Sequence, residues 1–340
     1  MYITKPDYFD QFRCIAGACP DSCCKEWDVQ VDEASAAYYR SLPGPLGDRL
    51  REVLHTEDGE TVMTILNGRC PMWRADGLCR IQAELGEGAL CKTCRDFPRL
   101  THDYGDFIEL GLELSCPEAA KFILGAQSPV SLRTSPQTGV AISRVAEPEP
   151  EYDVEAMAVL KATREKMLMV LSDSSRPVGE ALALALLYGY QAQSELDGAE
   201  AQPFDPEGAL AEVADLAKSG NMAEVVDFFL SLELLTPEWE NLLQNPTPSF
   251  WEKRHLALAR YLVQRYWLQA VSDYDLYSRV KFMVIACLLV KHLGGDLLRT
   301  AQLFSKEIEN DVDNVEAILD AAHAHPAFTD DKILGMLLEK

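Results

Sequence analysis

Apolar residues recur every three or four positions through the second half of the chain, which is the spacing of amphipathic helices. The clearest segment is 153–171 (DVEAMAVLKATREKMLMVL), which contains no helix breaker. Further helices are predicted over 177–193, 210–235 (one helix, or two with a break at 219–221), from 237, and over 249–271, 276–293, 296–309, 315–323 and 332–338. The pattern predicts an all-helical domain over 153–340.

Two helix starts carry capping signals. Thr236 precedes Pro237, which matches an N-cap followed by proline at the first helical position. Ser249 with Glu252 three residues later resembles a capping box and predicts the start of the helix 249–271.

Strand signals are few in the front third. Segment 61–66 (TVMTIL) is β-branched, and 107–114 (FIELGLEL) is either a short strand or the start of a helix. Residues 1–124 therefore predict a loop-rich module with at most one hairpin. Segment 125–152, rich in Ser, Thr, Pro and Glu, predicts a linker. The predicted fold class is mainly α, with little β.

Composition narrows the class of protein. Of the 340 residues, 48% are hydrophobic and 25% are charged, which is ordinary for a globular protein. The longest apolar run, 282–290, is far shorter than the roughly 20 residues of a spanning helix, so it predicts a buried core helix and no membrane segment. A net charge of −23 argues against nucleic acid as a partner. This negative charge either favours the approach of a cationic, lysine-bearing protein or serves only to keep the protein soluble.

The cysteines are concentrated near the start of the chain. Nine of the ten lie within the first 116 residues: Cys14, Cys19, Cys23, Cys24, Cys70, Cys79, Cys91, Cys94 and Cys116. The tenth, Cys287, lies inside the apolar run 282–290 and is predicted to be a small buried hydrophobe.

The nine cysteines are predicted to bind metal in a reduced, cytoplasmic protein. Residues 1–11 have none of the features of a secretory signal, and disulfides persist mainly in secreted chains. Nine is an odd number, and the adjacent Cys23 and Cys24 are awkward for ordinary disulfides. These two either serve different sites, or one of them is a spectator.

The spacing favours an iron–sulfur cluster, of the 4Fe-4S type, over zinc. Thiolates suit both. Structural zinc sites usually pair two short Cys-x2-Cys knuckles, whereas only Cys91 and Cys94 form one here. Nine thiols suit two four-ligand sites with one spare, or a four-ligand site with a three-ligand cluster that has an open iron. The sequence leaves both arrangements open.

A family resemblance rests on the residues around these cysteines. The motifs are FRC (12–14), CCKEWDV (23–29), CPMW (70–73), GLCRIQ (77–82), CKTCRDFPR (91–99) and SCPEAA (115–120). Over residues 8–123 the chain resembles the flagellin lysine-N-methylase family. Part of it also resembles a broader group of cysteine-rich, zinc- or iron-chelating domains.

The resemblance implies methyl transfer from S-adenosylmethionine to lysine side chains of flagellin. A lysine amine, with a pKa of about 10.4, must lose its proton before it attacks the methyl group. The sequence identifies neither catalytic nor cofactor-binding residues: it has no glycine-rich loop after a strand, and no Cys-x3-Cys-x2-Cys run. A cluster with an open iron is one route to holding the cofactor.

Other charged residues are weaker candidates. Those after the first cysteines either line a cationic pocket or form a surface loop: Glu26, Trp27, Asp28 and Asp32. Arg95 and Arg99 either neutralise an anionic cluster or are ordinary surface arginines. Two rival functions remain, a non-enzymatic metal-binding scaffold and an iron–sulfur redox protein.

Overall fold

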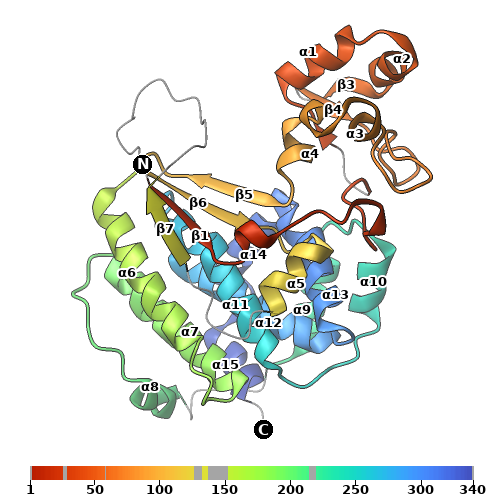
Figure 1. Ribbon diagram of the computed structural model, residues 1–340. Helices are drawn as coiled ribbons and strands as arrows, with labels where there is room; N and C mark the ends of the chain where they lie inside the picture. Colours follow the sequence, from red (N-terminus) through yellow and green to blue (C-terminus); the bar gives the residue numbers. More distant parts are fainter. Residues whose placement is uncertain are drawn as a thin grey trace.

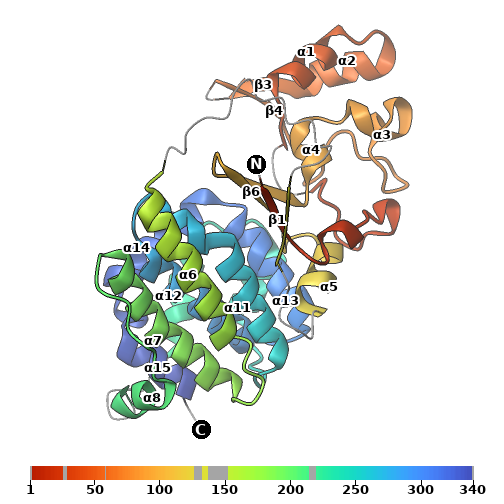
Figure 2. The same ribbon diagram turned by 60° about the vertical axis from the view of Figure 1, so that its left-hand side comes forward.

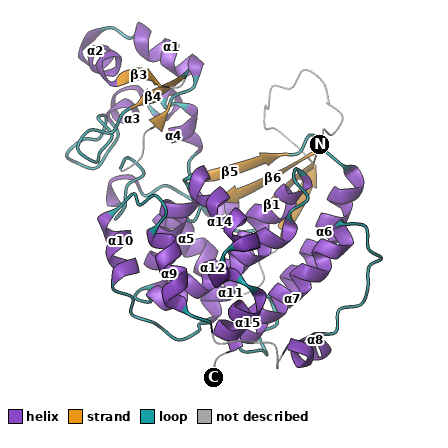
Figure 3. Ribbon diagram, turned by 180° about the vertical axis from the view of Figure 1, so that it is seen from behind, coloured by secondary structure: helices purple, strands orange, loops and turns teal. Residues whose placement is uncertain are grey.

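The computed structural model describes residues 2–25, 29–57, 59–125, 132–136, 152–213 and 220–338. The protein is mainly α, with many helices in a large body and a smaller lobe that projects from it (Figure 1). The lobe is defined here as residues 24–25 and 29–96, as far as they are described, and the body as the rest of the described chain. Figure 3 shows the same separation from behind.

The lobe combines short helices with a small antiparallel sheet. Its strands run in the order β2-β4-β3, with Leu54 opposite Met63. Asp32 caps the first helix, because its carboxylate accepts a hydrogen bond from the Ser35 backbone at 3.0 Å. The lobe elements are α1 (Glu33–Ser41), α2 (Gly44–Val53), α3 (Arg80–Leu85), α4 (Lys92–Asp96), β2 (Val29–Gln30), β3 (Leu54–Glu57) and β4 (Glu60–Met63).

A second sheet lies between the lobe and the helices (Figure 2). Its strands are β1 (Tyr2–Pro6), β5 (Arg99–Asp103), β6 (Phe107–Leu112) and β7 (Leu132–Pro136), in the order β5-β6-β1-β7. Strand β1 pairs with β6 in parallel and with β7 in antiparallel.

The front third therefore contains more β-structure than predicted. The strand signals in 61–66 and 107–114 correspond to β4 and β6, but β1, β2, β3, β5 and β7 were missed. All the missed strands are short. In addition, β1 and β7 pair with segments more than 100 residues away, so local periodicity does not reveal them. Strand β7 lies within the predicted linker; most of the rest of that linker is outside the described residues.

The helices of the body follow the predicted pattern closely. They are α5 (Pro117–Gly125), α6 (Val154–Val170), α7 (Val178–Leu196), α8 (Pro206–Val213), α9 (Met222–Leu230), α10 (Pro237–Gln244), α11 (Lys253–Tyr266), α12 (Leu276–Leu293), α13 (Leu297–Phe304), α14 (Val312–Ala324) and α15 (Asp330–Leu338). A π-helical turn, Ser305–Glu309, follows α13. No helix in the described ranges has an apolar stretch long enough to cross a bilayer.

The capping signals were right at one helix and misplaced at another. Thr236 caps α10, with Pro237 at the first turn. The box at α11 is formed by Glu252 and His255, so the helix begins at Lys253 and not at Ser249. The Ser249 hydroxyl donates instead to the Lys291 carbonyl at 3.1 Å.

Helix α12 is the centre of the body. Its whole apolar run Phe282–Val290 is buried, as predicted. It packs closely on α7, where a Cβ at Gly189 would lie 2.6 Å from Val280 Cγ1. Only glycine fits this approach without a shift of the neighbouring helix.

The buried cores divide the molecule differently from the predicted domains. One core joins Tyr8, Phe12, Leu114 and Cys116 to the helices of the body. The other belongs to the lobe alone. The boundary near residue 124 stays a prediction, while residues on both sides of it share one core.

Candidate functional site

The nine N-terminal cysteines form two overlapping groups of interacting thiols, which are joined through Cys23. The lobe group consists of Cys24, Cys70, Cys79, Cys91 and Cys94. The junction group, where the lobe meets the body, consists of Cys14, Cys19, Cys23 and Cys116. All ten cysteines of the chain are reduced.

The lobe group is built into the hydrophobic core of the lobe. Cys70 and Cys91 are buried among its apolar side chains, and the other three thiols pack against them. Burial, reinforced by the nearby thiolates of the group, raises the pKa of Cys70 to about 12. The fully buried Tyr39 lies beside the same thiols and donates to the Ala89 carbonyl at 2.7 Å. A cation would relieve the mutual repulsion of these sulfurs.

Three cysteines sit immediately before helices. Cys79 precedes α3, Cys91 precedes α4 and Cys116 precedes α5. Backbone N–H groups of the following turn donate to each sulfur. Such donors favour the thiolate, which is the form that binds metal. They are also among the groups that tune iron–sulfur clusters.

Two thiol pairs share hydrogen bonds. The Cys23 thiol donates to Cys24, and this bond helps lower the pKa of Cys24 to about 7. The Cys94 thiol donates to Cys91, which lowers the pKa of Cys91 below its ordinary value. Cys23 interacts with Cys24 and Cys94 as well as with Cys14 and Cys116, so it joins the two groups.

The junction group is held by loops that face the body. Burial, together with the thiolates of Cys19 and Cys14, raises the pKa of Cys116 to about 11. The Ala16 backbone N–H donates to Cys14 Sγ at 3.4 Å. The thiol of Cys19 donates to the Asp21 carbonyl at 3.2 Å.

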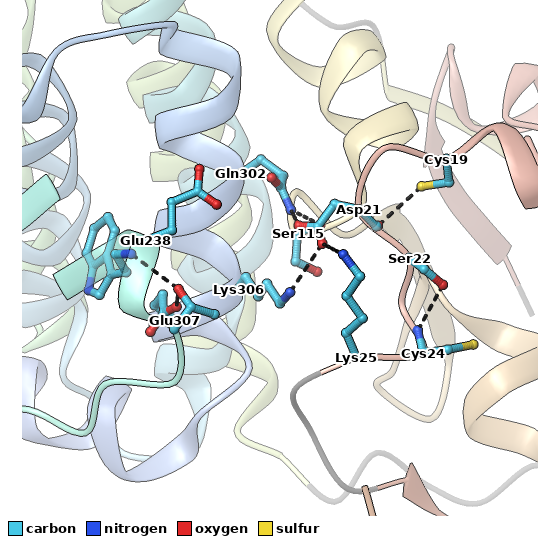
Figure 4. A network of polar contacts seen from close by, with 12 residues as sticks. Cys19, Asp21, Ser22, Cys24, Lys25, Ser115, Glu238, Gln302, Lys306 and Glu307 are labelled. Carbon is cyan, nitrogen blue, oxygen red and sulfur yellow. Dashed lines mark hydrogen bonds and ion pairs between the residues drawn. The ribbon is translucent and has the colours of Figure 1, made fainter. Parts of the chain in front are cut away.

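Asp21 connects this group to the body (Figure 4). Its buried carboxylate accepts from Arg299 Nη1 at 2.8 Å and Gln302 Nε2 at 3.1 Å, with Lys306 Nζ at 3.5 Å. Burial opposes ionisation of Asp21, but the Arg299 hydrogen bond and the Lys306 charge outweigh it and lower its pKa to about 2. Sequence reasoning missed Asp21, because its partners lie almost 300 residues away.

The donor set suits a soft metal. Thiolates are the usual ligands of zinc and of iron–sulfur clusters. No three His, Cys, Asp or Glu side chains of the described residues converge on a single point as ligands of one ion. In an iron–sulfur cluster the thiolates bind different irons, so their sulfurs stand further apart than around one ion.

The weaker sequence candidates have other roles or are not described. Glu26, Trp27 and Asp28 lie outside the described residues. Asp32 caps α1 and accepts from the Lys92 backbone at 2.8 Å. Arg95 pairs with Asp96 at the surface, and Arg99 stacks 5.2 Å from the centre of the Phe12 ring.

A polar pocket lies between the second sheet and helices α6 and α11. Its lining includes His102, Glu109, Arg164, Gln264 and Arg265. The Arg164 guanidinium donates two hydrogen bonds, of 2.7 and 2.8 Å, to the Glu109 carboxylate. His102 Nε2 and Gln264 Nε2 are buried and have no hydrogen-bond partner among the residues that the structure describes. The sequence gives no signal for this pocket, because its residues come from separate strands and helices.

Cys287 provides the control for any count of metal-binding thiols. It is fully buried in α12, and its Sγ contacts the His255 carbonyl at 3.5 Å. We expect Cys287→Ala to leave the metal content per chain unchanged, measured by elemental analysis. A loss of metal in this variant would show that the tenth cysteine takes part in a site.

Among known proteins, the chain matches a flagellar biosynthetic protein and lysine-N-methylases. The chain is 31% identical over 137 residues to the flagellar biosynthetic protein FliU of Salmonella muenchen, covering 38% of this chain and 81% of FliU. It is also 31% identical over 137 residues to the lysine-N-methylases of Salmonella typhimurium and Salmonella choleraesuis. Those matches span only 34% of either relative. No protein-family profile and no solved structure matches the chain.

The match to FliU extends over most of that protein's length, at an identity that marks common descent. The cysteine motifs point to the same relatives. The chain belongs to the flagellin lysine-N-methylase family.

Proposed function

We propose that the protein transfers methyl groups from S-adenosylmethionine to lysine side chains of flagellin, and that its thiols hold an iron–sulfur cluster. The similarity to two lysine-N-methylases and to a flagellar biosynthetic protein supports the reaction and the substrate. The packing of five cysteines in or against the small core of the lobe is the structural observation that supports the metal centre.

The reaction itself balances without a change of oxidation state. The neutral lysine amine attacks the sulfonium methyl, a C–N bond forms, the C–S bond breaks and S-adenosylhomocysteine leaves. The proton lost by the lysine must pass to an acceptor. Desolvation of the lysine lowers the pKa of its ammonium group, which makes this proton easier to remove. When bound, a cluster with an open iron supplies a site for the amino and carboxylate groups of the cofactor.

The protein's charge suits a lysine-bearing substrate. With a net charge of −23 it attracts cationic surface segments, and this attraction is strongest at low ionic strength. Carboxylates are also the most abundant proton acceptors on such a surface.

The test is methyl transfer with purified components. Anaerobically purified protein is mixed with unmodified flagellin and methyl-labelled S-adenosylmethionine, and flagellin peptides are analysed by mass spectrometry. We expect label on lysine side chains, retained in Cys287→Ala and lost in Cys116→Ser. Absence of label with metal-loaded protein would overturn the proposed activity.

A further inference from the structure

The polar pocket between the second sheet and helices α6 and α11 contains polar atoms that the fold leaves unused. His102 on β5 and Gln264 on α11 both line it, and the Nε2 atom of each is buried and unpartnered within the described part of the chain. Most buried polar groups of folded proteins have a hydrogen-bond partner, so such atoms need an explanation. A molecule that enters the pocket meets both side chains.

The charges of the pocket already compensate one another. The two hydrogen bonds from Arg164 occupy the Glu109 carboxylate. Arg265 lies 3.2 Å from Glu309 and also donates to the Tyr261 hydroxyl at 2.9 Å. A guest that stayed charged would lose its water without gaining a counter-ion of its own among these groups, which is costly. The pocket therefore favours a guest whose buried end is polar and becomes neutral.

The size of the pocket limits the guest further. The cavity volume is about 40 Å³, it is partly open to solvent, and part of its wall consists of Leu100, Leu110 and Leu112. This is room for about three water molecules. The end of a narrow, unbranched chain fits such a space, whereas a nucleoside needs a much larger pocket.

The pocket lies beside a segment that carries one of the predicted metal ligands. Leu112, at the end of β6, is part of the lining. The Leu114 backbone N–H donates to the hydroxyl of Tyr261, another lining residue, at 3.3 Å. Cys116 follows two residues later.

We propose that the polar pocket receives the side chain of the lysine to be methylated, and that His102 removes its proton. This inference rests on the proposed function, for which it names the substrate pocket and the proton acceptor. The methylene groups of the lysine lie against the leucines, and its nitrogen reaches His102. An N–H bond of the ammonium breaks and one forms at His102 Nε2, with the ring's own proton on Nδ1. The freed lone pair attacks the methyl group, and His102 passes its proton to solvent.

The surroundings of His102 suit this step. Burial and the charge of Arg265 lower the pKa of His102, against the opposing effect of Glu109, so its ring is neutral and able to accept a proton at pH 7. The same burial and the nearby guanidinium groups lower the pKa of a lysine from its usual value of about 10.4. The titratable and charged side chains that line the pocket with His102 are Tyr8, Glu109, Arg164, Tyr261 and Arg265.

A binding experiment tests the pocket without methyl transfer. n-Butylamine serves as the mimic of a lysine side chain, and nuclear magnetic resonance of isotope-labelled histidine rings is the readout. His102→Gln assigns the His102 signal, which we expect to shift when butylamine is added near pH 9. Gln264→Phe should abolish the shift by filling the cavity from α11, and circular dichroism establishes that it folds. No shift of the His102 signal in the wild-type protein would overturn the proposal.

The rate of flagellin methylation tests the role of His102. General acid–base catalysis contributes about 100-fold or more, so kcat of His102→Gln should fall by at least that factor at pH 7. The deficit should shrink towards pH 10, because lysine then loses its proton to water, and a purely structural defect would not follow this trend. His292→Gln is the matched control, since His292 is a half-buried histidine that does not line the pocket.

The two experiments separate this inference from the proposed function. Methylation by the wild-type protein at a rate that His102→Gln matches across the pH range would overturn the role of His102 and leave the methylase standing. A wild-type protein that methylates no flagellin, yet shows the butylamine shift, would overturn the proposed function and support the amine pocket.

Discussion

If the lobe thiols hold the proposed metal, its removal is expected to unfold the lobe while the helical body stays folded. The lobe's core contains few fully buried residues, and five thiols lie in it or against it. Small cores of this kind need a metal or disulfides to be stable. Without a cation, burial keeps thiols such as Cys70, with its pKa of about 12, protonated, so the lobe loses the bonds to metal that would link its segments. The core of the body, in contrast, contains no more than Cys116 and Cys287 of the ten cysteines.

Hydrogen exchange followed by mass spectrometry measures this effect directly. After anaerobic chelation, amides of α1, α2 and β4 should exchange rapidly, while those of α7, α11 and α12 should keep their protection. Cys79→Ser should give the same pattern without chelator, and Cys287→Ala should not. Unchanged protection of the lobe after complete metal removal would mean that its apolar core is sufficient by itself.

Breaking the ion pair in the polar pocket is expected to give the largest loss of stability from a single side chain. Arg164 and Glu109 are both buried and joined by two hydrogen bonds. Arg164→Met leaves the Glu109 carboxylate uncompensated on strand β6, and changes of this kind cost about 3–5 kcal/mol. Urea unfolding monitored by circular dichroism should show a lower midpoint with a similar slope.

The matched variant replaces both partners. Arg164→Met combined with Glu109→Leu removes the stranded charge, so most of the lost free energy of unfolding should return. If the single variant lost less than about 1 kcal/mol, the pair would behave like an exposed one, and its burial between the sheet and α6 would be contradicted.

Local signals account for what the sequence predicted correctly. The apolar run of α12, the period of α6 and the Thr236-Pro237 start of α10 depend on neighbouring residues alone. The family motifs also single out the nine cysteines, whose role as metal ligands stays a prediction. These features needed no knowledge of which distant segments meet.

Long-range contacts account for the rest. Strand β1 finds its partners in β6 and β7, each more than 100 residues away. Asp21 meets Arg299 and Gln302 across most of the chain, and a single aspartate between cysteines carries no periodic signal. The arrangement of the thiols also depends on folding, because Cys24 interacts with Cys70 and Cys79, which lie far from it along the chain.

The central claim is that the nine thiols hold iron–sulfur chemistry that serves S-adenosylmethionine. The direct measurement is anaerobic purification with iron, sulfide and zinc analysis, followed by absorption spectra before and after addition of S-adenosylmethionine. We expect iron and sulfide in matching amounts and a broad absorption that shifts when the cofactor is added. Stoichiometric zinc with no spectral response would contradict the claim and leave the cysteines with a structural role.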